Sequence, residues 1–217
     1  MSQKIKEIPM PKRFFPGLLP IIGDDKYTQV VARYQDLFEK HELPKHPALQ
    51  WHLIEGILPG LAFYQILREG GETQESSLAM IDRAFEILFL DNFARMKKLG
   101  RLFFIYPFLR IFIKPAMRQY PPEGWMIDWI QNDKNAIRFN MKSCFYFDTF
   151  SKFGASELTA SFCRVDDLTY DTMSPHIKWQ RLKTIARGQT YCDFCFLAVK
   201  DQPEICRISK KEIENEH

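Results

Sequence analysis

The stretch Ala-Ile-Arg-Phe-Asn-Met-Lys-Ser-Cys, at residues 136–144, alternates apolar and polar side chains. Ile137, Phe139 and Met141 fall on one side of an extended chain, and the polar residues between them fall on the other. This period of two predicts a β-strand with one buried face, and it sets the fold class of the residues around it.

The segments that follow complete a small mixed unit. Residues 145–153 and 158–173 have helical periodicity on either side of Gly154. Residues 177–187 alternate again, less regularly, and residues 191–199 form an apolar run after Gly188. We therefore predict a β-α-α-β-β unit with a small antiparallel sheet in the second half of the chain, and a short helix or turn at residues 125–130.

The first half predicts amphipathic helices instead. Apolar residues recur at helical spacing over residues 24–41, over residues 47–68 with a kink at Pro59, and over about 25 residues from Thr73. The fold class is thus α+β, with an N-terminal helical region packed on the C-terminal unit. The expected division is an extended arm at 1–23, the helical region at 24–123, the α+β domain at 124–200 and a charged tail at 201–217.

Composition excludes several classes of protein. The 217 residues include 46% hydrophobic residues, which is enough for a real core, and a net charge of +3 is too small to indicate a nucleic-acid partner. The sequence contains no GxGxxG, P-loop, HExxH or GxSxG motif. Five cysteines, an odd number, without a secretory signal favour reduced thiols and a cytoplasmic location.

The segment from Asn92 to Pro122 contains seven Lys and Arg residues and no acidic residue, around the aromatic run Leu102–Ile113. The run is too short to span a bilayer. One interpretation is a contact with an anionic membrane surface through residues 95–118. The other is a buried helix hairpin whose basic side chains extend to solvent. The high aromatic content, 14%, also hints at a homo-oligomer interface.

Cys163 is the first candidate for chemistry. On a helix it lies beside Asp166 and Asp167, three and four residues further on. A thiol next to a carboxylate can act as a nucleophile with a base, provided that a cation such as Arg181 or Arg187 offsets the carboxylate. The alternative is that Cys163 is simply a small buried residue.

Other candidates are weaker. Cys192 and Cys195 form a CxxC motif, but in a strand they point to opposite faces, which argues against a redox or zinc role for the pair. His176 follows a proline and is either a loop base or an ordinary surface residue. The remaining group of histidines at 41, 46 and 52 lacks the spacing of a metal site.

The order of residues in the second half resembles the L-2-amino-thiazoline-4-carboxylic acid hydrolase family. The resemblance covers about residues 124–198 and extends more loosely to residues 58–64. The matching pieces are Cys144-Phe-Tyr146, Gly154-Ala-Ser-Glu-Leu-Thr159, Phe162-Cys-Arg-Val-Asp-Asp167, Trp179-Gln-Arg-Leu-Lys-Thr184 and Arg187-Gly-Gln-Thr-Tyr-Cys-Asp-Phe194.

This resemblance implies a hydrolase that opens a 2-aminothiazoline-4-carboxylate ring, a cyclic amidine, to a carbamoyl-cysteine on a route to cysteine. Ring opening needs a nucleophile, a proton carrier and a cation for the substrate carboxylate. The implied roles are Cys163 as nucleophile, Asp166 as proton acceptor, Arg181 as carboxylate clamp, and Cys192, Asp193 and Cys144 in the same pocket.

Two alternatives stay open. Cys144, Cys163 and Cys192 could together bind a zinc ion that activates water, although the expected cofactor is none. The second half also resembles 4-vinyl-reductase-like modules, which would make the protein a non-catalytic small-molecule-binding domain.

Overall fold

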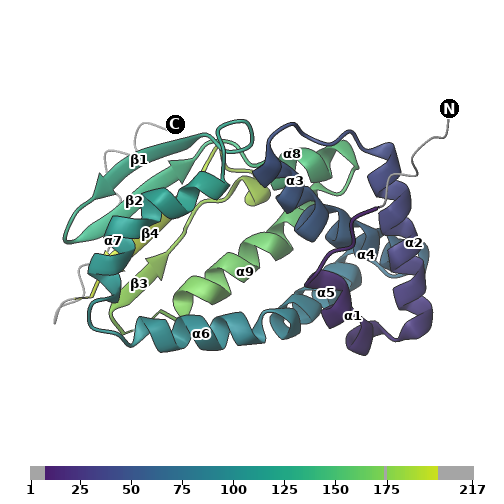
Figure 1. Cartoon of the computed structure of the whole chain (residues 1–217), viewed down its shortest axis with the longest axis horizontal. Helices are drawn as coiled ribbons and strands as arrows, with labels where there is room; N and C mark the ends of the chain where they lie inside the picture. Colours follow the sequence, from purple (N-terminus) through teal and green to yellow (C-terminus); the bar gives the residue numbers. More distant parts are fainter. Residues whose placement is uncertain (1–7, 174, 200–217) are drawn as a thin grey trace.

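The computed structural model describes residues 8–173 and 175–199. A helical block occupies one end of the molecule and a twisted four-stranded sheet the other, with one long helix crossing between them (Figure 1). This arrangement confirms the α+β class. The tail expected at 201–217 and the first residues of the expected arm lie outside the described residues.

The helical block is built from amphipathic helices whose apolar stripes meet in one cluster. Gly23, at φ 77°, separates the first helix from the second, and the Thr73 hydroxyl caps another by accepting a hydrogen bond from the N–H of Ser76 at 3.1 Å. The helices of this block are α1 (Phe14–Ile22), α2 (Asp24–Lys40), α3 (Pro47–His52), α4 (Leu58–Glu69) and α5 (Gln74–Leu88).

Helix α1 lies where the sequence suggested an extended arm. Pro16 falls in its first turn, where a backbone N–H has no partner within the helix, so this proline costs little. Burial of Phe14, Phe15 and Leu18 in the core then stabilises the helix. The proline-rich composition predicted the wrong local structure here.

The expected kink at Pro59 takes the form of a π turn. Residues Leu53–Ile57 form one π-helical turn between α3 and α4, and Pro59 then lies in the first turn of α4, where its missing N–H is tolerated. His52 immediately precedes the π turn, and Gly56 lies within it. A π turn of this kind is frequent at functional sites.

The long third helix is interrupted at Phe89. Helix α5 ends there, α6 (Leu90–Gly100) follows, and a hairpin leads into α7 (Ile105–Ala116). Figure 1 shows α6 along one side of the molecule and α7 across the face of the sheet. No helix among the described residues combines the length and apolar character required to cross a membrane.

The sheet is antiparallel, with the order β1-β2-β4-β3. The strand predicted around Phe139 is β2, at the centre of the sheet. The Phe139 ring stacks on the Phe194 ring, with centroids 4.8 Å apart. Trp129 pairs with Phe139 from the other side. The four strands are β1 (Ile127–Asn132), β2 (Ala136–Met141), β3 (Ile177–Gln180) and β4 (Cys192–Ala198).

Strand β1 corrects the helix or turn expected at residues 125–130. Its six residues are too few to show a clear period, and what fixes them as a strand is hydrogen bonding to β2, with Ile127 opposite Met141. Local sequence carried little information about this pairing.

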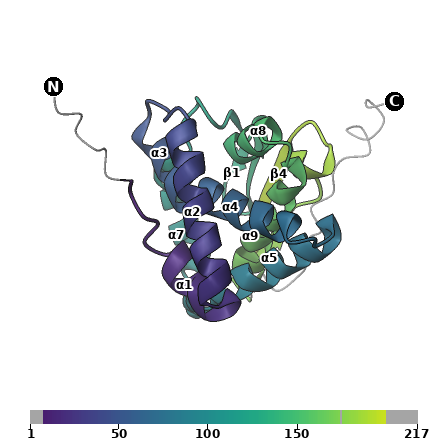
Figure 2. The ribbon, with the colours of Figure 1, turned by 90° about the vertical axis from the view of Figure 1, so that its right-hand side faces the viewer.

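Two helices after β2 connect the helical block to the sheet: α8 (Phe145–Lys152) and α9 (Thr159–Asp171). Phe162 and Val165 on α9 pack into the helical core, whereas Tyr170 packs into the core beneath the sheet. Figure 2 shows α9 and α5 together behind the N-terminal helices. Because α9 packs against both hydrophobic cores, its residues on the side of the sheet are held between these two cores.

Candidate active site

One face of α9 carries the predicted chemical groups toward the sheet. Cys163, Asp166, Asp167 and Tyr170 lie on that face because they are spaced by three, four and seven residues. The indole Nε1 of Trp179 donates a hydrogen bond to Asp167 Oδ1 at 3.0 Å. This hydrogen bond fixes the rotation of α9 relative to β3. Cys163, Asp166 and Asp167 share one face of α9, as their spacing in the sequence predicted.

Arg181 follows β3 and joins it to α9. Its guanidinium lies 2.8 Å from Asp167 Oδ1 and 3.4 Å from Asp166 Oδ2, and it donates a hydrogen bond to the carbonyl of Cys163 at 2.6 Å. The side chain is 1% exposed and also lies over the Phe194 ring, 5.2 Å from its centroid. Burial alone would lower the pKa of Arg181, but the neighbouring carboxylates raise it, so the group stays charged.

The geometry places Arg181 as a positioning residue. Its guanidinium is already bound by Asp166, Asp167 and a backbone carbonyl, and almost none of it is accessible. The carboxylate-clamp role that the resemblance implied would require the side chain to leave these partners, so we assign substrate contact to other groups.

Asp166 combines desolvation with an accessible surface. Its side chain keeps 43% of its surface accessible. Yet the surrounding protein desolvates it enough to raise its pKa to about 6, against an opposing effect of Arg181. Asp166 is therefore a desolvated carboxylate that solvent still reaches. At neutral pH it is mainly ionised and can still accept a proton.

The three thiols predicted for the site share one electrostatic neighbourhood. The charge states of Cys144 and Cys192 are the smallest of the effects on the pKa of Cys163, after those of burial, Arg181 and Asp166, so the thiols of α9, β4 and the residue before α8 are within electrostatic range of one another. Burial raises the pKa of Cys163 strongly and that of Cys144 to about 12, and it also raises the pKa of Cys192. All three are neutral thiols at neutral pH.

Each thiol has a different local setting. Cys144 directly precedes α8, and the nearby backbone N–H groups of Phe147 and Tyr146 lower the pKa of its thiol less than burial raises it. Cys192 is buried, and its sulfur accepts a hydrogen bond from the N–H of Ile185 at 3.2 Å. Arg181 lowers the pKa of Cys163 less than burial raises it, because that cation is shared with two aspartates.

A sequence-family model named L-2-amino-thiazoline-4-carboxylic acid hydrolase matches residues 51–196, more than half of the chain. The chain belongs to this family. In this hydrolase-family member the match runs from the residue before His52 to beyond Cys192, so it includes the whole group described above. Comparisons with curated proteins and with solved structures found no match.

The hydrolase-family site also contains phenol and imidazole groups that sequence reasoning missed. After the larger effect of burial, and for Tyr146 also that of Tyr120, the charge of Asp166 raises the pKa of Tyr120, Tyr146 and Tyr170, so all three phenols lie near Asp166. They are protonated donors at neutral pH. We call the group formed by these three tyrosines with Cys144, Cys163 and Asp166 the α9 recess.

His52 orients one of these phenols. Its Nε2 lies 3.2 Å from the carbonyl of Gln119, which can only accept, so Nε2 carries the proton and Nδ1 accepts from the Tyr146 hydroxyl at 3.0 Å. Burial lowers the pKa of His52 to about 4, which keeps the ring neutral. A Cβ on Gly56 would lie 3.0 Å from the Tyr146 oxygen, so the π turn brings a glycine where this phenol needs space. Only its adjacency to Cys144 could have pointed to Tyr146.

Two residues considered from the sequence lie apart from the recess. Asp193 and Cys195 alternate with the inward-facing residues of β4. The Asp193 carboxylate accepts hydrogen bonds from the N–H groups of Leu182 and Lys183 at 2.9 and 2.5 Å, so it fixes the loop after β3. Asp193 therefore does not share the pocket of Cys192, and the CxxC cysteines are on opposite faces as the alternation predicted.

The donor geometry does not support the zinc alternative. Over residues 8–173 and 175–199, no group of three or more His, Cys, Asp or Glu side chains is arranged so that it could hold a metal ion.

Proposed function

We propose that this protein hydrolyses a small cyclic amidine of the 2-aminothiazoline-4-carboxylate type in the α9 recess. The observation that carries the proposal is Asp166: an accessible carboxylate with a pKa of about 6, one helical turn from the Cys163 thiol. A general base with a pKa near the working pH is the best compromise between being ionised and being able to hold a proton. The family match supports the substrate class.

The chemistry follows from the charge of the substrate. A protonated aminothiazoline is a cation with an electrophilic C2, and its charge in the recess would stabilise the thiolate that the free protein disfavours. Cys163 passes its proton to Asp166 as its sulfur adds to C2. The bond from C2 to the ring sulfur then breaks, and the ring sulfur takes the proton back from Asp166. Water next attacks the same carbon and gives one proton to Asp166, the bond from C2 to the Cys163 sulfur breaks, and this sulfur takes that proton from Asp166. The other proton of the water is released to solvent as the neutral carbamoyl product forms.

Other groups of the recess would position the substrate. Tyr120 and Tyr170 keep their phenolic protons and can donate hydrogen bonds to the substrate carboxylate. The Tyr146 hydroxyl donates a hydrogen bond to His52, so the phenol oxygen is left to accept a hydrogen bond from an amidine N–H. Cys144 and Cys192 line the site as neutral thiols, and Arg181 holds Asp166 in place.

The test is turnover of 2-aminothiazoline-4-carboxylate, followed by loss of the ring absorbance, in the wild type and three variants. Asp166→Asn should lower kcat at least about 100-fold, the usual contribution of a general base. Cys163→Ala should abolish turnover, and acid-quenched wild type should carry a substrate-derived mass on the peptide that contains Cys163. Cys195→Ala is the matched control, because it removes a thiol from the opposite face of the same sheet.

The outcomes separate the alternatives. Full activity of Cys163→Ala together with an inactive Asp166→Asn would mean that Asp166 activates water directly, and it would remove the nucleophile from the mechanism. An inactive wild type that is thermally stabilised by the same compound would make the protein a binding module. If the compound neither reacts nor stabilises, the substrate class is wrong.

A further inference from the structure

Helix α7 has two apolar faces, and only one of them is buried. Ile105, Tyr106 and Ile113 pack beneath the sheet, and the Tyr106 hydroxyl donates a hydrogen bond to the carbonyl of Asp133 at 2.8 Å. This inner face accounts for the position of α7 across the sheet in Figure 1. The inner face does not account for the apolar residues on the outer side of the helix.

The outer face is a continuous aromatic and aliphatic stripe. Phe104, Phe108 and Phe112 are four residues apart, and Ile111 follows Phe108 by three residues, so the four side chains share one face of the helix, which we call the α7 outer stripe. Phe108 is 50% exposed and Ile111 is 63% exposed, and Phe103 in the hairpin before α7 is 82% exposed. Scattered exposed hydrophobic residues are ordinary, but a stripe of this kind along one helix indicates a contact surface.

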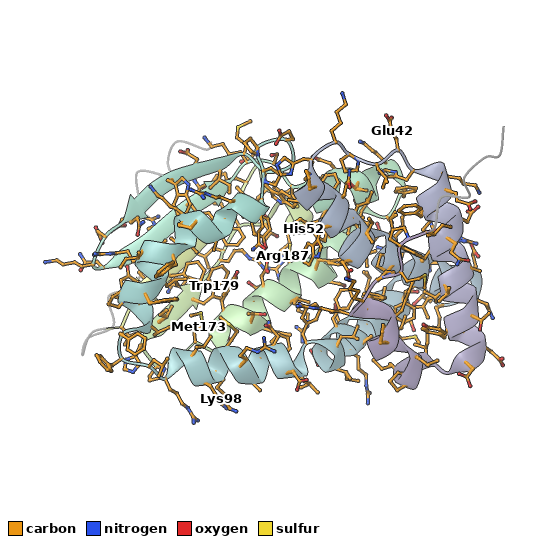
Figure 3. All side chains as sticks on the ribbon, in the orientation of Figure 1. Glu42, His52, Lys98, Met173, Trp179 and Arg187 are labelled. Carbon is orange, nitrogen blue, oxygen red and sulfur yellow. The ribbon has the colours of Figure 1, made fainter. Side chains whose placement is uncertain are left out.

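The chain segment that carries the α7 outer stripe is basic. Residues 92–122 contain no Asp or Glu. Arg110 and Lys114 lie beside the stripe, one turn apart. Arg110 interacts electrostatically with Asp133 in the turn after β1, and the Lys114 ammonium lies 5.1 Å from the centroid of the Trp129 ring. Lys98 on α6 points away from the body of the molecule (Figure 3). A segment with exposed Phe and Ile, several cations and no acidic residue of its own has the composition of helices that lie in the interface of an anionic membrane.

We propose that the α7 outer stripe binds the surface of a bilayer containing anionic phospholipid. The inner face of α7 is fixed to the sheet, so the helix would lie in the plane of the interface, with its rings among the acyl chains and Arg110 and Lys114 at the phosphates. A bilayer fits better than an acidic protein partner because the rings continue along the full length of α7 and into the hairpin at Phe103. This inference is independent of the hydrolase proposal.

The experiment is co-sedimentation of the full chain with vesicles of phosphatidylcholine and phosphatidylserine, and with vesicles of phosphatidylcholine alone. Binding to the anionic vesicles should fall as salt is raised from ~0.05 to ~0.5 M. The variant Arg110→Gln/Lys114→Gln should bind about 25-fold more weakly, since each interfacial cation contributes about fivefold. Lys152→Gln/Lys178→Gln removes equal charge from exposed positions outside the hairpin and should bind as the wild type does.

The apolar contribution has its own matched pair. Phe108→Ser/Phe112→Ser should reduce binding at least tenfold, whereas Met126→Ser/Leu182→Ser, at residues that are 59% and 63% exposed outside the stripe, should not. Thermal melting would verify that every variant is folded. No sedimentation at low salt, or equal binding by both serine pairs, would overturn the proposal. So would a dimer in light scattering that only Phe108→Ser/Phe112→Ser dissociates and that ignores vesicles, because the stripe would then join two copies of the chain.

Discussion

Replacing Asp166 with Asn should make the protein more stable at neutral pH while it removes the proposed base. The recess raises the pKa of Asp166 from its ordinary 3.8 to about 6, so the folded protein disfavours the ionised carboxylate. Asparagine has nearly the same shape without the charge. The substitution therefore imitates the protonated form that the fold prefers.

The size of the gain follows from the pKa. For a fully buried group, a change from 3.8 to about 6 corresponds to ~3 kcal/mol in the free energy of unfolding. Because 43% of the side chain is accessible, solvent screening reduces this figure, and we expect ~1–1.5 kcal/mol. Folded Asp166 retains its proton to a higher pH than unfolded Asp166. The free energy of unfolding of the wild type therefore falls as pH rises from about 4 to about 6, and the advantage of asparagine appears over the same window.

Urea unfolding of both proteins at pH values between 4.5 and 8 measures this difference directly. Asp167→Asn is the matched control: it weakens contacts to Arg181 and Trp179 and should destabilise by about 1–3 kcal/mol. The reasoning is refuted if Asp166→Asn is less stable than the wild type at pH 8, or if its difference from the wild type does not change with pH. A gain in stability combined with a loss of turnover is the pattern expected of a functional residue.

Other predictions concern the supports of the site. Arg181→Met should destabilise by about 3–5 kcal/mol in urea unfolding, since it leaves two aspartates without their buried cation, and a loss below 1 kcal/mol would contradict its positioning role. Gly100→Ala should cost about 1–3 kcal/mol in thermal melting, because the new Cβ would lie 2.6 Å from the Cα of Met173, and an unchanged melting temperature would show that α6 and α9 can separate freely. Iodoacetamide should label Cys144 and Cys163 slowly at pH 7.5 and rapidly after unfolding, because burial raises the pKa of both thiols. Peptide mass mapping measures the labelling, and fast labelling of the folded protein would indicate thiolates.

The sequence predicted the parts of the fold that carry a strong period. The alternation around Phe139 identified the central strand, and the apolar stripe of residues 24–41 matches α2 within a residue. It failed at β1, whose strand character depends on pairing with β2, and at α1, whose helix is stabilised by burying Phe14 and Phe15. Both failures occur where tertiary contacts outweigh local preference.

The candidate site divides in the same way. The spacing of Cys163 and Asp166 along one helix placed them correctly, because helical geometry follows from the sequence. The sequence could not show that the Arg181 cation would be bound by neighbouring aspartates, or that burial would leave the thiols protonated. His52 was set aside as a metal ligand. Its contact with Tyr146, 94 positions away, depends entirely on how the helices pack.

The α9 recess contains residues from both sides of residue 124, and this limits how far the protein can be shortened. Tyr120 precedes the expected boundary, and Tyr146 depends on His52 and Gly56 from the helical region. A chain that begins at residue 124 would keep Cys163 and Asp166 but lose the imidazole that orients Tyr146 and one of the phenols beside them. A fusion protein that contains only the C-terminal half would therefore keep the Asp166 carboxylate and the Cys163 thiol without Tyr120 and His52, which lie in the first half of the chain.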